Sequence, residues 1–282
     1  MRNALLLITF LATTAALAQQ NPPAVKYPRV SQHASLTQTI GTTDMTIVWS
    51  RPGVKGRKIW GALVPYGQVW RTGANEATTI SFSDDVTING QKLAAGTYSL
   101  HTIPGEKEWT LIFNSVANQW GSYSYDQTKD ALRVKATPAT ASFTEWLNFE
   151  VPVLSADQAT VSLRWENVAV PFTVNANTTQ KVLAAATKAV AEAKADDVRT
   201  PLAAANFAFD NGMMTEAAQW DDASLKAGET MNNLWLKARI LLKQGKKTDA
   251  IVTAEKALAK KTEKDSSELA SEIRKQIDEW KK

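Results

Sequence analysis

The chain has 282 residues, 44% of them hydrophobic, and its 32 Lys and Arg against 28 Asp and Glu leave a formal net charge of +4. This length allows one large or two ordinary domains with a real core, and the small charge excess excludes the basic surface of a typical nucleic-acid-binding protein. With no Cys and only two His, the sequence excludes thiolate and three-His metal sites and a Cys nucleophile. We therefore expect no bound metal, no cofactor and no nucleic-acid partner.

The first residues have the pattern of a secretory signal peptide. After Met1-Arg2-Asn3, an apolar run extends from Ala4 to Ala18 and ends in Ala16-Leu17-Ala18, a small-residue cleavage pattern. This run is too short to span a bilayer, which takes about 20 residues. A buried N-terminal helix fits less well, because polar and Pro residues follow at once. We predict residues 1–18 as a signal peptide cleaved after Ala18, and a bacterial periplasmic or secreted protein with no membrane span after cleavage.

Residues 19–174 have the alternation of β-strands. Period-two or fully apolar runs lie at residues 47–50, 86–88, 109–113, 161–165 and 168–170. Asn89-Gly90 lies between two such runs and suits a type I′ hairpin, because both central residues of that turn need a positive φ. Roughly nine to eleven short strands without a long helical period predict an antiparallel β-sandwich or barrel.

Residues 175–282 change to helical spacing, which predicts a second, α-helical domain. One apolar stripe predicts a helix near Thr178–Lys194, and a second predicts a helix near Asp265–Trp280. Asp265 and Glu268 have the spacing of a capping arrangement at the start of the second helix.

Two segments between these helices are similar to each other. Ala205, Phe209, Gly212 and Ala217 correspond to Ala238, Leu242, Gly245 and Ala250. The segment Asn233–Lys261 resembles a tetratricopeptide repeat, and the upstream copy is degenerate because Asp221 and Ser224 occupy positions where small residues are expected. We expect the flanking helices to cap this stack and a protein partner to bind on its concave side.

The least regular part of the β region runs from Ser50 to Ile80 and is rich in Gly, Pro, Arg and Trp. Together with Gly96–Leu100, Ile103-Pro104, Glu108-Trp109 and Gln119–Gly121, it resembles the bacterial family called domain of unknown function 2911. The resemblance covers about residues 30–172. It implies an exported β domain that often carries a helical-repeat tail, and it implies no established reaction.

Five residues of this stretch are candidate ligand-binding residues: Tyr66, Trp70, Arg71, Asn75 and Glu76. Arg is a natural fork for carboxylates and phosphates, and the aromatic rings can stack on sugars. A Glu beside Arg can be an anchored acid or base, with Gly73 giving the turn that presents both. The simpler alternative is a salt bridge between Arg71 and Glu76 that fixes the loop to the sandwich.

The candidates for catalysis are weaker. No nucleophile elbow and no phosphate-binding loop is present. We name Glu76 and His101 as the candidate catalytic residues. On its predicted strand, His101 lies on the same face as Ser99. A pair of carboxylates for glycoside hydrolysis would combine Glu76 with Asp126 or Glu108.

Seven of the ten Trp lie between residues 49 and 165, and they divide by local context. Three alternate with strand neighbours and are predicted to be core residues: Trp49, Trp109 and Trp165. Three others lie in Gly-bounded loops and are candidates for an exposed binding surface: Trp60, Trp70 and Trp120.

These patterns favour a non-enzymatic binding or assembly module of the periplasm or cell envelope. A glycan or small molecule would bind the β domain, and a protein partner would bind the helical repeats. One alternative is an envelope saccharide or polymer hydrolase that uses Glu76 and Arg71. A purely structural protein, in which the apolar patterns serve packing alone, is the other.

Overall fold

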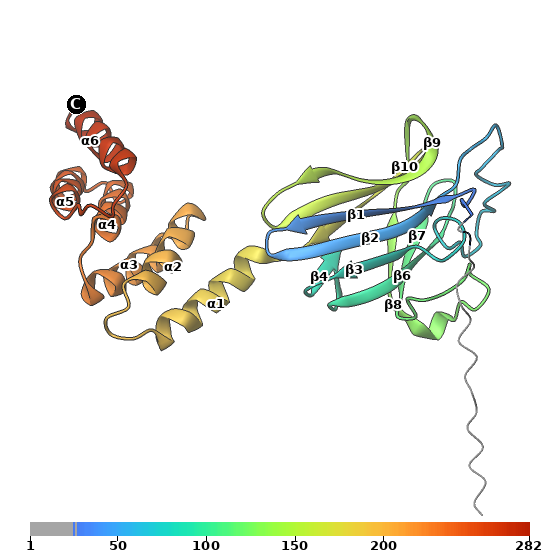
Figure 1. Ribbon diagram of the computed structural model, residues 1–282, viewed down its shortest axis with the longest axis horizontal. Helices are drawn as coiled ribbons and strands as arrows, with labels where there is room; N and C mark the ends of the chain where they lie inside the picture. Colours follow the sequence, from blue (N-terminus) through green and yellow to red (C-terminus); the bar gives the residue numbers. More distant parts are fainter. Residues whose placement is uncertain (1–24, 26) are drawn as a thin grey trace, which may run out of the picture.

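The computed structural model describes Val25 and residues 27–282 (Figure 1). The predicted signal peptide, residues 1–18, lies outside the described residues. Within the described part, a β region is followed by a helical region, as the sequence predicts. No helix of the described residues combines the length and the apolar character that a bilayer crossing requires.

The β region is a sandwich of two antiparallel sheets. The first has six strands in the order β1-β2-β3-β6-β7-β8 and the second has four in the order β5-β4-β10-β9. This confirms the predicted antiparallel β architecture and, among the described strands, selects the open sandwich over the closed barrel. The strands are β1 (Gln32–Ile40), β2 (Thr43–Arg51), β3 (Thr79–Phe82), β4 (Val86–Ile88), β5 (Gln91–Leu93), β6 (Gly96–Ile103), β7 (Trp109–Asn114), β8 (Asp130–Ala136), β9 (Ala139–Leu154) and β10 (Gln158–Asn175).

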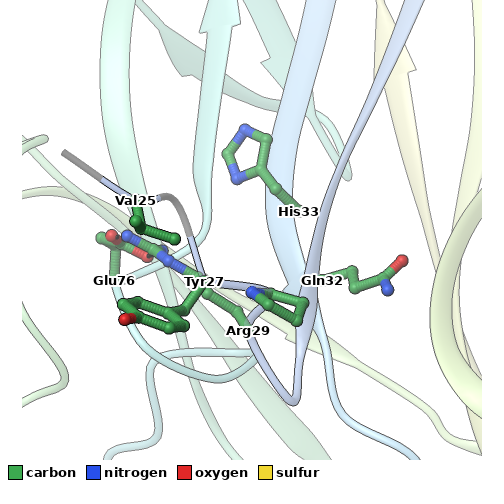
Figure 2. Close-up of a pocket in the computed structure, with 7 residues that line it drawn as sticks. Val25, Tyr27, Arg29, Gln32, His33 and Glu76 are labelled. Atoms are coloured by element: carbon green, nitrogen blue, oxygen red, sulfur yellow. Dashed lines mark hydrogen bonds and ion pairs between the residues drawn. The ribbon is translucent and has the colours of Figure 1, made fainter. Parts of the chain in front are cut away.

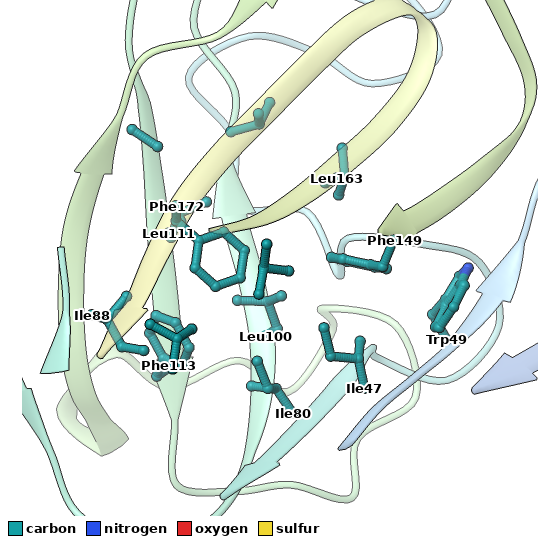
Figure 3. Packing of buried hydrophobic residues seen from close by; sticks show 14 of the residues in the cluster. Ile47, Trp49, Ile80, Ile88, Leu100, Leu111, Phe113, Phe149, Leu163 and Phe172 are labelled. Carbon is teal, nitrogen blue, oxygen red and sulfur yellow. The ribbon is translucent and has the colours of Figure 1, made fainter. Parts of the chain in front are cut away.

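The core lies between the two sheets, because alternate residues of each strand point inward (Figure 3). Ile47 and Leu100 come from the first sheet, and Leu163 and Phe172 come from the second. The predicted core residues Trp49, Trp109 and Trp165 are all buried, which confirms that prediction.

The predicted Asn89-Gly90 turn joins β4 to β5. Asn89 has a φ of 46° and Gly90 a φ of 81°, the left-handed pair that a type I′ turn requires. The Asn89 side chain also bonds the Thr173 backbone of β10, so the turn is fixed to the adjacent strand.

Six helices follow: α1 (Thr178–Glu192), α2 (Arg199–Asp210), α3 (Met214–Ala227), α4 (Met231–Lys243), α5 (Lys247–Ala259) and α6 (Ser267–Lys281). α2 packs on α3 and α4 packs on α5, which are the two segments that the sequence relates. Gly212 and Gly245 occupy corresponding inter-helix turns, with φ of 75° and 78°. The cap of α6 is Ser266, which accepts a bond from the Leu269 backbone, and not Asp265 as predicted.

The loops that carry the candidate site gather at the end of the sandwich opposite α1 (Figure 1). Residues 52–78 connect β2 to β3 there, and residues 115–129 connect β7 to β8. Short backbone bridges fix the first loop at several points, such as Trp60 to Val64 and Trp70 to Thr102. The irregular stretch is therefore an ordered cap on one end of the sandwich.

Candidate functional site

Four Trp side chains pack together and form a floor where the loop of residues 52–78 meets the sandwich: Trp60 and Trp70 from the loop, Trp109 from β7 and Trp165 from β10. Trp60 packs edge-to-face on Trp109 with ring centroids 4.9 Å apart, and Trp70 stacks on Trp165 at 5.9 Å. Trp60 is buried, so the prediction that it is a surface residue is wrong: the loop folds back and encloses it. Trp70 is half-buried and forms part of this floor.

Backbone hydrogen bonds and turns determine the path of residues 70–75. Trp70 exchanges two backbone hydrogen bonds with Thr102 of β6, each 2.8 Å long. Thr72 and Asn75 both have a φ of 58°, so these two residues make the turns that we expected Gly73 to make. Gly73 instead allows close packing, because a Cβ there would lie 3.1 Å from the Ser50 carbonyl oxygen.

A cleft of about 300 Å³ opens above the Trp floor. Three cationic residues line it, Lys55, Arg57 and Arg71, together with Leu63 and the Trp70–Trp165 stack. No carboxylate belongs to its lining among the residues that the structure describes. An apolar floor under several positive charges is suited to a ligand that has both a ring face and an anionic group.

Arg71 has the free guanidinium of this cleft. Its Nε is buried without a hydrogen-bond partner, and no described carboxylate lies within salt-bridge distance of it. Arg57, by contrast, donates to the Val54 and Gly53 carbonyl oxygens at 3.1 and 2.6 Å. The two terminal nitrogens of Arg71 have no partner among the described residues either, and unlike Nε they are not enclosed, so they are the donors that a bound acceptor can reach.

Glu76 is not paired with Arg71. Arg29 Nη1 donates to both carboxylate oxygens of Glu76 at 2.7 Å (Figure 2). This hydrogen bond holds the pKa of Glu76 below its usual value, so the side chain stays ionised. The alternative that Arg71 and Glu76 form a loop-fixing salt bridge is therefore wrong, because the partner of Glu76 comes from the segment before β1.

Asn75 fixes that same segment. Its Nδ2 donates to the Ser31 carbonyl oxygen at 3.1 Å and to Ser50 Oγ at 3.3 Å. The side chain thus connects residues before β1 to the end of β2 and has a structural role.

Tyr66 lies on the outer side of the loop, partly exposed, with its ring against Gly61. Burial and the nearby carboxylates of Glu106 and Glu166 raise the pKa of its hydroxyl. It does not line the cleft. Of the five predicted binding residues, the structure thus brings only Trp70 and Arg71 together in one cleft.

His101 is fully buried beneath the loop of residues 115–129, which excludes direct contact with a substrate in this conformation. Neither ring nitrogen has a hydrogen-bond partner among the described residues. Burial lowers the pKa of His101, and the nearby Gly121 backbone and Asp130 carboxylate act in the opposite direction. Beside it, Asp130 accepts bonds from Tyr125 and from Arg133, so this polar cluster secures the loop.

The other carboxylates that we considered with Glu76 have local partners. Asp126 caps a short 3-10 helix, Gln127–Lys129, by accepting from the Thr128 backbone. Glu108 pairs with Lys135 at 2.6 Å. Neither lines a hollow with Glu76 among the pockets of the described residues.

The comparisons with known proteins agree with this β region. The model of a family described as "Protein of unknown function (DUF2911)" matches residues 31–174. The chain belongs to the DUF2911 family. The match includes every residue of the Arg71 cleft except Val30, and it ends three residues before Asn177, the N-cap of α1. No curated protein and no solved structure matches the chain.

Sequence reasoning missed Lys55 and Arg57 as cleft residues and Arg29 as the partner of Glu76. A signal for the first two was present, because the sequence between Asp44 and Glu76 has several basic residues and no acidic one. No comparable signal indicates Arg29, which is 47 positions from Glu76.

Proposed function

We propose that this DUF2911 protein is an exported binding module of the bacterial cell envelope and that its Arg71 cleft holds a carboxylate-bearing ligand. The observation that carries the proposal is the free guanidinium of Arg71, which lies with Lys55 and Arg57 over stacked Trp rings. The signal-peptide pattern supports export, and the ligand is expected to be a component of the envelope.

The chemistry of the cleft limits the ligand. A guanidinium binds a carboxylate through two parallel hydrogen bonds. The half-buried ring of Trp70, which stacks on the buried Trp165, favours the apolar face of a ring or a short aliphatic chain. A volume of about 300 Å³ is at the small end of ligand sites, so it accepts one acidic sugar or the end of a short peptide. Acidic glycans and the peptide stems of peptidoglycan both provide this chemistry.

The hydrolase alternative receives less support from the geometry. A general acid for glycoside hydrolysis needs a raised pKa, whereas Arg29 lowers the pKa of Glu76. Arg71, the proposed electrostatic partner, lines a different hollow from Glu76. Turnover of an envelope polymer that is lost in Glu76→Gln at an unchanged melting temperature would favour the hydrolase over the binding module.

The helical region supports the second part of the proposed function, a protein partner. Every second helix, α2, α4 and α6, lines a groove of about 460 Å³. Leu202, Trp235 and Leu269 provide apolar contacts there, and Arg239 and Glu272 provide charges of both signs. We propose that this groove holds an extended segment of a partner protein.

The test of the cleft is calorimetric titration of the chain with two probes, a glucuronic acid oligosaccharide and a muramoyl peptide. We expect one of them to bind and Arg71→Gln to weaken it about tenfold or more, because a hydrogen bond to a charged group contributes about 1.5–3 kcal/mol. Lys58→Gln is the matched control, since it removes one positive charge from the same loop outside the cleft lining.

Binding of the oligosaccharide would identify an acidic glycan as the source of the carboxylate, and binding of the muramoyl peptide would identify a peptidoglycan stem. Equal losses in Arg71→Gln and Lys58→Gln would show general charge attraction and would contradict the proposed site. Failure of both probes to bind would contradict it as well.

A further inference from the structure

Two hollows share Glu76 in their lining and are separate from the Arg71 cleft. The larger, about 790 Å³, is lined by Tyr27, Arg29, His33 and Glu76 among others (Figure 2). The smaller, about 240 Å³, is lined by Glu76, Asn118 and Trp120 among others. Each of the two hollows that share Glu76 thus also contains an aromatic side chain, Tyr27 in the larger and Trp120 in the smaller.

The aromatic rings of these two hollows are both exposed. Tyr27 is 76% exposed and Trp120 60%, whereas the Trp side chains of the floor, Trp60, Trp70, Trp109 and Trp165, are buried or half-buried. Exposure of a large apolar ring is unfavourable in water, and rings with a polar edge are typical of recognition surfaces.

The structure holds Trp120 in place without burying its ring. The backbones of Glu76 and Trp120 form a bridge, and on either side Ala77 donates to the Gln119 carbonyl oxygen and Gly121 to that of Asn75. The Gln119 side chain is buried and bonds Ser99, Asn114 and Val116. Because these bonds already fix the backbone at Trp120, a ligand that binds there orders little further and the loss of conformational entropy on binding is small.

The polar groups of the two hollows suit hydroxyl groups better than they suit an ion. Arg29 and Glu76 neutralise each other, and Arg29 uses only Nη1 for this pair among its described contacts. Its other nitrogens, the remaining lone pairs of Glu76 and the exposed Asn118 amide offer donors and acceptors side by side. A neutral polyhydroxylated ligand can use both kinds at once.

We propose that this surface is a second binding site, for a neutral oligosaccharide, with pyranose rings stacked on Trp120 and Tyr27 and hydroxyl groups bonded to Glu76 and Arg29. The site is separate from the carboxylate cleft and goes beyond the proposed function. It gives a role to the exposed rings of Tyr27 and Trp120, which the packing of the sandwich does not require.

The test is calorimetric titration with two neutral probes, chitohexaose and cellohexaose. We expect one of them to bind, and we expect Trp120→Ala to weaken it about tenfold, which corresponds to about 1.4 kcal/mol. Tyr123→Ala is the matched control, because Tyr123 is on the same loop, is 84% exposed and lines neither hollow. Melting temperature checks that both variants remain folded.

Arg71→Gln separates this proposal from the previous one. We expect it to leave the affinity for the neutral hexasaccharide unchanged, while Trp120→Ala leaves carboxylate binding unchanged. The second site is overturned if neither probe binds, if Tyr123→Ala weakens binding as much as Trp120→Ala, or if Arg71→Gln removes binding of the neutral probe.

Discussion

Asp221 is a buried carboxylate in the helical region with a large effect expected on stability. The residue is fully buried on α3, and neither carboxylate oxygen has a hydrogen-bond partner among the described residues. Burial raises its pKa from 3.8 to about 7; Lys237 on α4 acts against this shift, and the adjacent Asp222 adds to it. At a pH between these two values, the folded chain therefore retains a proton on Asp221 that the unfolded chain has lost.

The direction of the pH effect follows from this difference. The contribution of Asp221 to stability is fully present below the unfolded pKa of 3.8 and is lost as the pH rises through about 7. Between about pH 5 and pH 8 the loss amounts to about 3 kcal/mol, at 1.36 kcal/mol per pKa unit. We expect Asp221→Asn to remove this dependence and to stabilise the helices at about pH 8.

Urea denaturation followed by far-UV circular dichroism at the two pH values measures the effect. Asp222→Asn is the comparison variant, because Asp222 is next in sequence, exposed and paired with Lys237 at 2.6 Å. Asp222 also raises the pKa of Asp221, so we expect this variant to reduce the pH dependence without removing it. An unchanged pH slope in Asp221→Asn would show that Asp221 is ionised in the folded chain.

For single residues, the sequence predicts which strand residues are buried. It does not predict which side chains of distant loops contact each other. Trp109 and Trp165 alternate with strand neighbours, so their burial follows from period two. Trp60 has Gly-bounded neighbours that suggest exposure, but the fold of the whole loop places it on Trp109. The Arg29–Glu76 pair depends on where two distant segments meet, and no local pattern encodes that position.

At the scale of elements, the junction between the sandwich and α1 depends on a crowded turn. Gly41 lies at the β1–β2 turn with a φ of 59°, and a Cβ there would lie 2.0 Å from Thr178 Oγ1 and 2.3 Å from the Ala156 carbonyl oxygen. Asp157 of the β9–β10 turn accepts bonds from the Thr179 backbone and hydroxyl, both 2.7 Å, and so caps α1.

Two glycines with similar backbone conformations separate crowding from strain. Gly56 has a φ of 69°, and a Cβ there would meet nothing within 4 Å. We expect Gly56→Ala to lower the free energy of unfolding by about 1 kcal/mol, because Ala is strained in the left-handed conformation. We expect Gly41→Ala to lower it by at least about 2 kcal/mol more, because the added Cβ also overpacks the junction. Denaturant midpoints of the two variants measure the difference, and equal costs would show that the junction yields without penalty.

The elements differ in how far the sequence predicts them. The Asn89-Gly90 hairpin needs only two adjacent residues of the right type, and it is confirmed. The cap of α6 is shifted by one residue, because Asp265 bonds the Thr262 backbone and leaves Ser266 to cap. The cap of α1 comes from Asp157, 22 residues away from Thr179, which helix-start rules based on adjacent residues cannot detect.

At the scale of the whole molecule, the apolar clusters divide between the two regions. One cluster lies entirely within residues 34–176, and the other two lie within residues 183–280. No apolar cluster of the described residues includes members of both regions. The first cluster reaches Ala176, two residues beyond the predicted boundary between residues 19–174 and 175–282. Since cooperative unfolding depends on a shared core, a division after Ala176 implies two cooperative units.

Differential scanning calorimetry tests that division. We expect two transitions, because α1 meets the sandwich mainly through polar contacts such as Asp157 with Thr179. A bound ligand stabilises only the unit that binds it, by about 2.7 kcal/mol at 100 times its dissociation constant. The carboxylate probe is therefore expected to raise one transition, and Asp221→Asn at about pH 8 to raise only the other. A single transition that responds to both changes would mean that the polar junction couples the two cores into one unit.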